Sequence, residues 1–485
     1  MKVLVLNPPF HPRFSRSQRS PAVTKGGTLY YPFWLAAATG VLEKDGFDCL
    51  LLDAPARGFA RGEVLSRAAD FSPDIVVCDT STPSIYNDAE VAESLKETLP
   101  RAFVVLTGTH PTALPEETLA LAPRVDAVAL GEYDYTLRDL ARRLKAGGDP
   151  AGVAGLCIRR GGICLRTAPR PLIEDLDELP FVSETYRKHL DIRDYYFAAA
   201  DYPVVQIISA RGCPQRCFFC VYPQTFHGRR FRPRSPENVA AEFAFIAANL
   251  PEAREIGLED DTFTVDRGRA RRICELLVGQ RNRLKWYTNV RADLEYETLA
   301  AMKEAGCRLV TVGFESGSQE LLNRMKKGLR LEQSRAFVKN ARRAGILVHG
   351  CIMVGNPGET RETMAESLRF AKELACDSFQ FYPLIVYPGT EAYAWAKAHG
   401  YLLTEDYSKW MSPSLSHASP LSLPGISMEE MERFCERAYR SYHFNPRYLA
   451  RKLVQSALRP SEGRRNLRSA RRYAAYLARG LRRRR

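Results

Sequence analysis

The chain has 485 residues, of which 45% are hydrophobic and 26% are charged, so it is long enough to form two or three globular domains. No apolar run is long enough to span a membrane, and the opening Met1-Lys-Val-Leu-Val-Leu6 is too short for a secretion signal; we therefore expect a cytoplasmic protein and exclude an integral membrane protein. The net charge of +14 is uneven: residues 451–485 hold 13 Lys or Arg and one acid, a net of +12, which leaves about +2 for the rest.

The first 145 residues alternate between strand-like and helix-like segments. Apolar runs predict five strands, at residues 2–7, 48–53, 74–79, 102–107 and 127–131. This order is typical of an α/β domain with an open, doubly wound (Rossmann-like) sheet, which binds ligands at the carboxyl ends of its strands. Because no Gly-x-Gly-x-x-Gly follows the first strand, dinucleotide binding is not indicated.

Residues 146–200 are predicted to form a connector that contains a short hairpin at 155–166. From residue 201 to residue 400, six apolar strands alternate with helical patterns. The strands are expected at 204–208, 255–259, 284–289, 308–313, 346–352 and 378–382. Six such units predict a partial (β/α)6 barrel, whose chemistry would lie at the carboxyl ends of the strands.

Residues 401–485 are predicted to form a small helical C-terminal region with helices at 428–440 and 446–458, followed by the basic tail. Such a tail could bind nucleic acid or an anionic membrane surface, or it could be a solvated, partly helical end. No known RNA-binding module is present, and the charge excess is confined to the tail. A nucleic-acid partner is therefore not expected.

Three thiols lie within eight residues, as Cys213, Cys217 and Cys220 in the spacing Cys-x3-Cys-x2-Cys. Thiolates are the usual ligands of iron–sulfur clusters, and three of them leave one iron of a four-iron cluster open. Zinc is the alternative, with His227 as the fourth ligand. The scattered cysteines, such as Cys78, are expected to pack as small hydrophobes in a reducing compartment and not as disulfides.

The cysteine spacing, with aromatic Phe219 before the last Cys and a buried strand ahead of the first, resembles the signature of the radical S-adenosylmethionine (radical SAM) superfamily. The resemblance implies a 4Fe-4S cluster held by the three cysteines. It also implies that S-adenosylmethionine is cleaved to a 5′-deoxyadenosyl radical, which abstracts hydrogen from an unactivated C–H bond. The protein would supply orientation and exclude water.

Other motifs at the ends of the predicted strands resemble the same superfamily. Glu259-Asp260-Asp261 could be a solvated acidic turn, but by resemblance Glu259 and Asp260 are candidates for the methionine amino group, and Asp261 is the candidate catalytic residue for substrate contact. The remaining candidate cofactor-binding residues in the barrel are Glu315, Ser316, Gly355 and Tyr387. Arg211 and Arg216, beside the cysteines, could tune the cluster or be exposed bystanders.

The N-terminal half resembles the cobalamin-binding domain of many radical SAM enzymes, through loops around Gly108, His110 and Gly131. The Asp-x-His-x-x-Gly motif that ligates cobalt in other cobalamin proteins is missing. Radical SAM relatives usually lack this motif too, so its absence does not exclude cobalamin, which is a possible third cofactor. His110 is either a ligand of cobalt or an ordinary loop histidine.

The resemblance implies a radical SAM enzyme that acts on a natural product or a sugar-type small molecule, as in antibiotic biosynthesis. The leading expectation is cobalamin-dependent radical C-methylation. The alternative is a cobalamin-independent radical deoxygenase or dehydratase of an aminosugar diol, and ring formation is a third possibility. The expected partners are the small-molecule substrate and an electron donor such as flavodoxin or ferredoxin.

Overall fold

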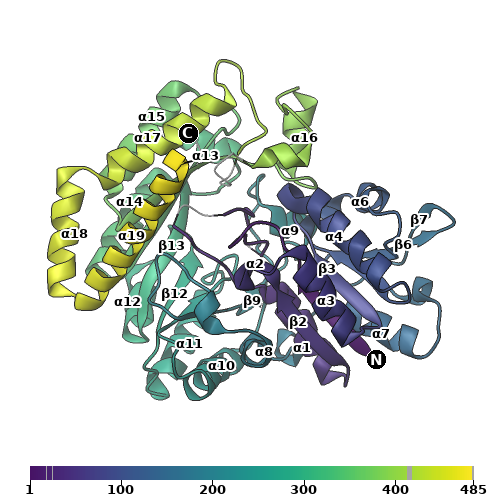
Figure 1. Ribbon diagram of the computed structural model, residues 1–485. Helices are drawn as coiled ribbons and strands as arrows, with labels where there is room; N and C mark the ends of the chain where they lie inside the picture. The colour runs from purple at the N-terminus through teal and green to yellow at the C-terminus, as the bar shows by residue number, and fades with distance from the viewer. Residues whose placement is uncertain (18, 24–25, 412–417, 483–485) are drawn as a thin grey trace.

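The N-terminal part of the molecule is built on one sheet. The structure, a computed structural model, describes residues 1–17, 19–23, 26–411 and 418–482. Seven strands follow the order β2-β1-β3-β4-β5-β6-β7 (Figure 1). They are β1 (Lys2–Asn7), β2 (Asp48–Asp53), β3 (Ile75–Asp79), β4 (Phe103–Thr107), β5 (Ala127–Ala129), β6 (Leu156–Arg160) and β7 (Ile163–Arg166). The five predicted strands are parallel, and the hairpin that we assigned to the connector adds an antiparallel edge to them.

Both faces of the parallel part of this sheet, β1 to β5, are buried, which explains why these strands are continuous apolar runs. Along β1, Val3 and Val5 enter the core that is shared with the barrel, whereas Leu4 and Leu6 enter a second core on the opposite face. The helices that cover the sheet are α1 (Phe33–Lys44), α2 (Ala54–Arg57), α3 (Arg61–Phe71), α4 (Ile85–Thr98), α5 (Thr109–Ala113), α6 (Pro115–Leu121) and α7 (Asp134–Lys145). The doubly wound α/β fold is confirmed.

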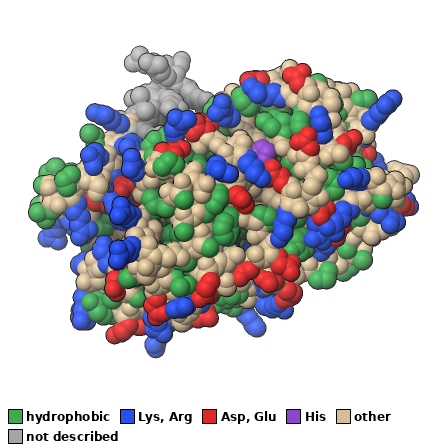
Figure 2. Space-filling view, turned by 90° about the horizontal axis from the view of Figure 1, so that it is seen from below, with side chains coloured by type: hydrophobic (Ala, Val, Ile, Leu, Met, Phe, Trp, Pro, Cys, Tyr) green, Lys and Arg blue, Asp and Glu red, His purple; other side chains and the backbone are tan. Residues whose placement is uncertain are grey.

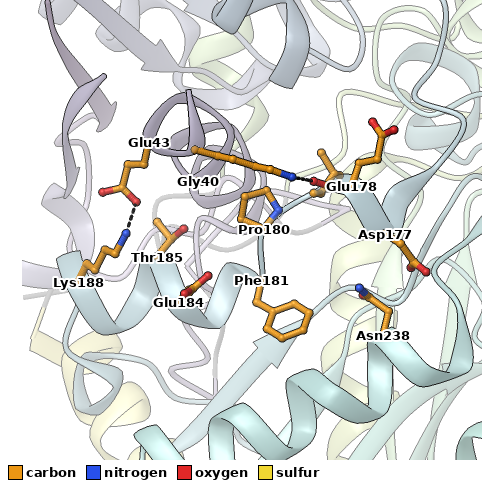
Figure 3. A pocket seen from close by; sticks show the side chains of 12 residues that line it. Gly40, Glu43, Asp177, Glu178, Pro180, Phe181, Glu184, Thr185, Lys188 and Asn238 are labelled. Carbon is orange, nitrogen blue, oxygen red and sulfur yellow. Dashed lines mark hydrogen bonds and ion pairs between the residues drawn. The ribbon is translucent and has the colours of Figure 1, made fainter. Parts of the chain in front are cut away.

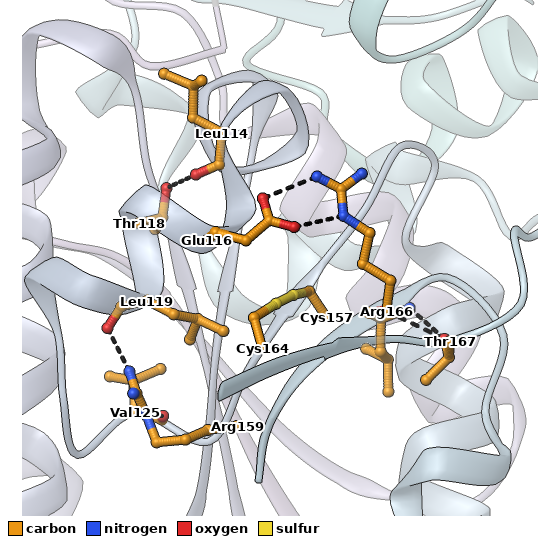
Figure 4. The surroundings of a disulfide bond; sticks show 11 residues. Leu114, Glu116, Thr118, Leu119, Val125, Cys157, Arg159, Cys164, Arg166 and Thr167 are labelled. Atoms are coloured by element: carbon orange, nitrogen blue, oxygen red, sulfur yellow. Dashed lines mark hydrogen bonds and ion pairs between the residues drawn. A yellow bond between two sulfur atoms is a disulfide. The ribbon is translucent and has the colours of Figure 1, made fainter. Parts of the chain in front are cut away.

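The β6–β7 hairpin carries a disulfide between Cys157 and Cys164, whose Cα atoms are 5.9 Å apart (Figure 4). The expectation that the scattered cysteines stay unpaired is wrong for these two. The reason is the hairpin register, which pairs Cys157 with Arg166 and Arg159 with Cys164, so that the two thiols are diagonal neighbours across the strands. Beside the disulfide, Arg166 binds both oxygens of Glu116, at 2.6 and 2.8 Å.

The second sheet has six parallel strands in the order β15-β14-β13-β12-β11-β8. They are β8 (Val204–Ile207), β11 (Glu255–Leu258), β12 (Lys285–Val290), β13 (Cys307–Glu315), β14 (Leu347–Val354) and β15 (Ser378–Pro383). The helices of this part are α10 (Pro236–Asn249), α11 (Arg267–Gly279), α12 (Tyr296–Glu304), α13 (Gln319–Arg324), α14 (Leu331–Ala344) and α15 (Arg361–Leu374). Because β8 and β15 are not paired with each other, the barrel is open, as predicted.

Short elements join the two sheets. The connector holds the helix α8 (Val182–His189), which lies against α1, β2 and β8. The cysteine loop is flanked by a two-stranded antiparallel sheet of β9 (Ala210–Arg211) and β10 (Arg232–Pro233), with α9 (Val221–Thr225) between them. This small sheet ties the two ends of the segment that contains the cysteines.

The C-terminal region packs on the outside of the barrel. It follows α16 (Glu391–Ala398) and consists of the short helix η5 (Tyr407–Trp410), α17 (Met428–His443), α18 (Pro446–Leu458) and α19 (Pro460–Arg482). Tyr442 of α17 stacks edge-on against Phe379 of β15, with ring centroids 4.9 Å apart. The last two helices, yellow in Figure 1, form a hairpin at the side of the barrel remote from the N-terminal sheet. None of the described helices is both long and apolar enough to cross a membrane.

Candidate active site between the two sheets

The three cysteines follow the carboxyl end of β8 and lie beneath the protein surface. Cys213 and Cys217 are buried and Cys220 is half-buried, and all three thiols are free. Burial raises the pKa of Cys220, and the Asp261 carboxylate and the sulfurs of Cys217 and Cys213 raise that pKa further, so the three sulfurs lie within electrostatic reach of one another. Buried thiolates therefore need positive charge close by, which cluster irons supply when bound.

The spacing of the sulfurs also tests zinc as the alternative. Two thiolates on one zinc lie no more than about 4.6 Å apart, because each Zn–S bond is about 2.3 Å. Among the described residues, the one group of three potential ligands within 4.8 Å of each other is Glu116, Cys157 and Cys164, and its two thiols form the disulfide. His227 instead lies 3.0 Å from Glu132. The cysteine loop therefore fits several irons better than one zinc.

Buried ion pairs fasten the cysteine loop to the N-terminal sheet. Arg211 of β9 donates to both carboxylate oxygens of Asp134, at 2.7 and 3.0 Å. Arg232 of β10 donates to Glu132 at 2.8 Å, and His227 Nδ1 lies 3.0 Å from the same carboxylate. Although burial opposes it, hydrogen bonds from His227 and Arg232 hold the pKa of Glu132 well below its usual range. Arg211 is thus a buried structural cation, whereas Arg216 is exposed.

The acidic triplet after β11 is divided among three different environments. Glu259 accepts hydrogen bonds from Gln206 Nε2 at 3.0 Å and from the Tyr287 hydroxyl at 2.7 Å. Asp260 is 1% exposed and accepts from the backbone N–H groups of Ser209 and Ala210, at 2.6 and 3.2 Å. A solvated acidic turn is therefore excluded for these two. Asp260 holds the start of the cysteine loop, which leaves Glu259 as the better placed candidate for a cofactor amino group.

Asp261, the third acid, pairs with a residue that our sequence interpretation missed. Arg19 Nη2 lies 3.2 Å from Asp261 Oδ1 and donates to the Asp260 carbonyl at 2.8 Å. The same guanidinium lies 6.0 Å from the ring centroid of Tyr222. Despite the opposing effect of burial, Asp261 and Cys220 raise the pKa of Arg19. Arg19 lies in the long segment between β1 and α1, where no motif marks it.

The end of β13 is strained and charged. Glu315 has a φ of 65°, in the left-handed region, and follows a register shift between Gly313 and Glu315. Its carboxylate accepts from Lys327 Nζ at 2.8 Å. Although burial opposes it, Glu315 and then Cys217 raise the pKa of Lys327, so this lysine is a second functional candidate that we did not identify. Neighbouring Ser316 lies 3.2 Å from Ser367, Oγ to Oγ.

The remaining barrel candidates lie at different depths. Phe219 is half-buried, with the Lys327 ammonium 6.0 Å from its ring centroid. Gly355 has a φ of 96°, and a Cβ there would meet the sulfur of Met431 at 2.9 Å, so α17 covers this position closely. Tyr387 is buried with its ring centroid 6.3 Å from that of Trp410. The structure therefore brings Phe219 close to the Glu315–Lys327 pair, whereas the C-terminal region covers Gly355 and Tyr387.

The carboxyl edge of the N-terminal sheet is lined with buried polar groups. A Cβ at Gly108, whose φ is 124°, would meet the Thr80 carbonyl oxygen at 2.5 Å, so only glycine fits. His110 is 1% exposed, and its Nδ1 lies 3.2 Å from Thr82 while its Nε2 has no hydrogen-bond partner among the described atoms. Burial lowers the pKa of His110 to about 3. The Gly131 N–H donates to Thr112 Oγ1 at 3.0 Å.

These features fit loops that line a corrin: close backbone approach at Gly108, buried hydroxyl groups and a neutral imidazole with one free nitrogen. Tyr407 of η5 packs edge-on against His110, with ring centroids 4.8 Å apart. The C-terminal region therefore closes over this edge. The buried Arg16, from the same segment as Arg19, pairs with the buried Asp88 at 2.6 Å.

A cavity of about 430 Å³ lies away from the cysteines, in the seam between α1, the connector and α8 (Figure 3). Its two lysines already have partners: Lys188 binds Glu43 at 2.9 Å, and Lys44 donates to the Glu178 backbone carbonyl at 2.7 Å. No cysteine lines it. We therefore place the chemistry at the cysteine loop and not in this cavity.

Comparisons with known proteins match both halves of the chain. The model of the Radical SAM superfamily matches residues 207–371, and that of the B12 binding domain matches residues 19–141. The Uncharacterized methyltransferase PH0819 of Pyrococcus horikoshii is 31% identical over 456 residues, which cover 94% of this chain and 95% of the relative. An anaerobic magnesium-protoporphyrin IX monomethyl ester cyclase of Rubrivivax gelatinosus is 27% identical over 384 residues, which cover 77% of this chain and 66% of the cyclase.

Among solved structures, the radical S-adenosylmethionine methyltransferase TsrM of Kitasatospora setae, with cobalamin and a [4Fe-4S] cluster bound, has a similar fold. The TM-score is 0.65 at 22% identity, over 89% of this chain and 81% of that one. At this identity the likeness concerns the fold alone. The B12-binding model includes strands β2 to β5 of the N-terminal sheet, and the radical SAM model includes strands β11 to β14 of the barrel.

Proposed function

Because the chain belongs to the radical SAM superfamily and carries a B12-binding domain, we propose that it is a cobalamin-dependent radical SAM methyltransferase that methylates a carbon of a small molecule. Its cofactors are a 4Fe-4S cluster, S-adenosylmethionine and cobalamin. When bound, these groups supply one-electron cleavage of a carbon–sulfur bond and a carrier for the methyl group.

The residues that would hold the cluster are Cys213, Cys217 and Cys220. Asp260 fixes the start of their loop through two backbone N–H groups, and the β9–β10 pair fixes both ends. Glu259 is the candidate acceptor for the S-adenosylmethionine amino group, and Glu315 with Ser316 the candidates for its other polar groups. Phe219, Gly355 and Tyr387 remain candidates for shaping the same site.

Gly108, His110 and Gly131 would line the cobalamin site. A neutral imidazole is the form of histidine that binds metals, and burial keeps His110 neutral. Tyr407 covers it, so exclusion of water is a second role of this edge. Asp261 would contact the substrate, with Arg19 compensating its charge beside the cysteines.

One observation carries the choice of a cobalamin-dependent reaction over the cobalamin-independent one: the cysteine loop is joined directly to the N-terminal domain by the Arg211–Asp134 and Arg232–Glu132 pairs. Glu132 and Asp134 follow Gly131, at the edge where cobalamin domains bind their ligand. If the N-terminal domain were only a scaffold, nothing would require its ligand edge to be held against the cluster loop. The relation to PH0819 also supports methylation over deoxygenation.

The proposed partners are the substrate and a one-electron donor such as flavodoxin or ferredoxin, which the cluster requires in order to be reduced. We also propose that the protein works in the cytoplasm, because an open cluster survives in a reducing compartment, and that the Cys157–Cys164 pair is reduced there. The substrate is proposed to be a natural product or a related small molecule.

The test is the product pattern of the anaerobically reconstituted enzyme with S-adenosylmethionine that carries a deuterated methyl group. Methylation predicts equal amounts of 5′-deoxyadenosine and S-adenosylhomocysteine, and a product that carries the label. Release of 5′-deoxyadenosine alone would contradict methylation. A product lighter by water would then indicate deoxygenation, and an unlabelled product with a new ring would indicate cyclisation.

A further inference from the structure

Helix α18 turns its large apolar side chains toward solvent, unlike an ordinary surface helix. No residue of α18 is buried, and its large apolar side chains point outward. Leu453 is 72% exposed, Leu458 77%, Val454 58% and Leu449 46%. Ala450 and Ala457 are exposed on the same side. A surface helix of a globular protein normally turns such a stripe toward the core.

The face of α18 that touches the barrel is polar. Arg451 donates to the backbone carbonyls of Ala375 and Cys376. The Tyr448 hydroxyl donates to the Asp377 carbonyl at 3.0 Å, and Gln455 Nε2 donates to the Asp377 carboxylate at 3.2 Å. These bonds fix the rotation of the helix. The apolar face is therefore held outward by specific contacts.

Cationic side chains surround this apolar face. Four exposed arginines lie on the hairpin: Arg447 on α18, Arg459 between the two helices, and Arg464 and Arg471 on α19. From Arg459 to the end of the chain the sequence has 11 arginines and one acid, Glu462. That acid is buried in pairs with Arg308 and Arg465, at 3.0 and 2.5 Å. Figure 2 shows hydrophobic side chains at the left margin of the molecule, where α18 lies, with Lys and Arg side chains next to them.

The hairpin lies at the amino ends of the barrel strands, opposite to the cysteines. Arg308, which pairs with Glu462, is the second residue of β13. Ser469 of α19 donates to the carbonyl of Ala198, ahead of β8, at 3.0 Å. The patch is thus remote from the carboxyl ends where the candidate site lies, and it does not serve to guide a small substrate to the cysteines.

We propose that the α18–α19 hairpin docks the enzyme on an anionic phospholipid surface, with α18 lying in the interface. Outward leucines next to many arginines are the composition of helices that bury an apolar face among acyl chains while arginines contact lipid phosphates. A second copy would bring two strongly cationic surfaces together, which is unfavourable. Nucleic acid would use the arginines but would leave the leucines in water. The phospholipid surface satisfies both groups.

The experiment is cosedimentation of the full-length, cluster-loaded enzyme with vesicles of phosphatidylcholine that contain about 30% phosphatidylglycerol, beside vesicles of phosphatidylcholine alone. We expect binding to the mixed vesicles that weakens with salt, and little binding to the neutral ones. The double variant Leu453→Glu/Leu458→Glu is expected to bind the mixed vesicles at least about tenfold more weakly. Leu403→Glu is the matched control, because Leu403 is 55% exposed but lies outside the hairpin.

Cleavage of S-adenosylmethionine in the absence of vesicles should be unchanged in all these variants, which shows that they fold. If the double variant binds mixed vesicles as well as the wild type, the proposal for α18 is wrong. As a second measurement, light scattering gives the oligomeric state of each variant. A wild-type dimer that the double variant converts to a monomer, without vesicle binding by either, would assign the face to a second copy and overturn the proposal. Binding to RNA and not to vesicles would do the same.

Discussion

The carboxyl edges of the two sheets are both filled with buried charges, but the charges are compensated in different ways. At the barrel edge, Glu259 receives hydrogen bonds from Gln206 on β8 and Tyr287 on β12, the strands on either side of its own. At the N-terminal edge, the buried Asp88 is paired with Arg16, which belongs to the segment between β1 and α1, 72 residues away.

The two edges are therefore assembled in different ways. Barrel residues can be placed from strand order alone, because parallel strands bring their carboxyl ends together. The N-terminal edge instead depends on a segment without regular structure, and the same segment sends Arg19 to the cysteine loop. The two edges are then joined by the ion pairs of Glu132 and Asp134. Each of the following changes tests one of these connections.

The largest effect is expected from Cys217→Ala, which removes a ligand at the barrel edge. Two thiolates do not hold a cluster with one open iron, so iron content and formation of 5′-deoxyadenosine should both fall to background. Cys274→Ala is the control, because Cys274 is also buried but lies on α11. Cleavage at the wild-type rate by Cys217→Ala would remove the basis of the site.

Glu132→Gln tests the junction between the two edges. Loss of this buried carboxylate leaves Arg232 without its charged partner, and we expect the free energy of unfolding in denaturant to fall by about 3 to 5 kcal/mol. The control is Glu116→Gln, which breaks an ion pair with Arg166 whose side chains are more than half exposed, and should cost less than about 1 kcal/mol. Equal losses in the two variants would show that the buried Glu132 carboxylate stabilises the fold no more than an exposed ion pair does.

His110→Gln tests the N-terminal edge through its pH dependence. In the folded protein burial lowers the pKa of His110 to about 3, whereas the unfolded chain binds this proton below about pH 6.5. The folded state therefore loses stability as the pH falls from 6.5 toward 3, by about 2 kcal/mol at pH 5 from this residue. Unfolding measured at pH 7.5 and 5 should show a drop that is smaller by that amount in the variant. An unchanged drop would mean that His110 is protonated or exposed.

Arg19→Met tests the contact that the N-terminal segment makes with the barrel edge. We expect the cluster to remain but kcat/KM for S-adenosylmethionine cleavage to fall about tenfold, or about 1.4 kcal/mol, because Asp261 loses its counter-charge next to Cys220. Arg13→Met, an exposed position in the same segment, is the control. Identical rates in the two variants would leave Arg19 without a role in the reaction.

Most of the fold could be predicted, because long apolar runs in alternation with helical patterns leave few arrangements. The six barrel strands and the five parallel strands of the N-terminal sheet all lie where expected. The hairpin at 155–166 was also recognised, but not its place in the sheet. Strand pairing depends on which edge is open, and a local pattern does not contain that information. The Cys157–Cys164 disulfide was missed for the same reason.

The site was predictable only where its residues follow strands. The cysteines and the acids after β11 stand at strand ends, and their order along the chain identified them. Arg16, Arg19 and Lys327 carry no such signal, since they come from irregular segments and reach the site only through tertiary packing. Helix α18 illustrates a further limit. Its bounds, Pro446–Leu458, match the predicted 446–458, but periodicity does not tell which face meets solvent.

We expect the two edges to form one centre with two metal-containing cofactors. It is tested most directly by the iron and cobalamin content of protein purified without oxygen from cobalamin-fed cells, after reconstitution of the cluster. We expect about four irons and about one cobalamin per chain. Four irons without cobalamin in the wild-type protein would contradict it.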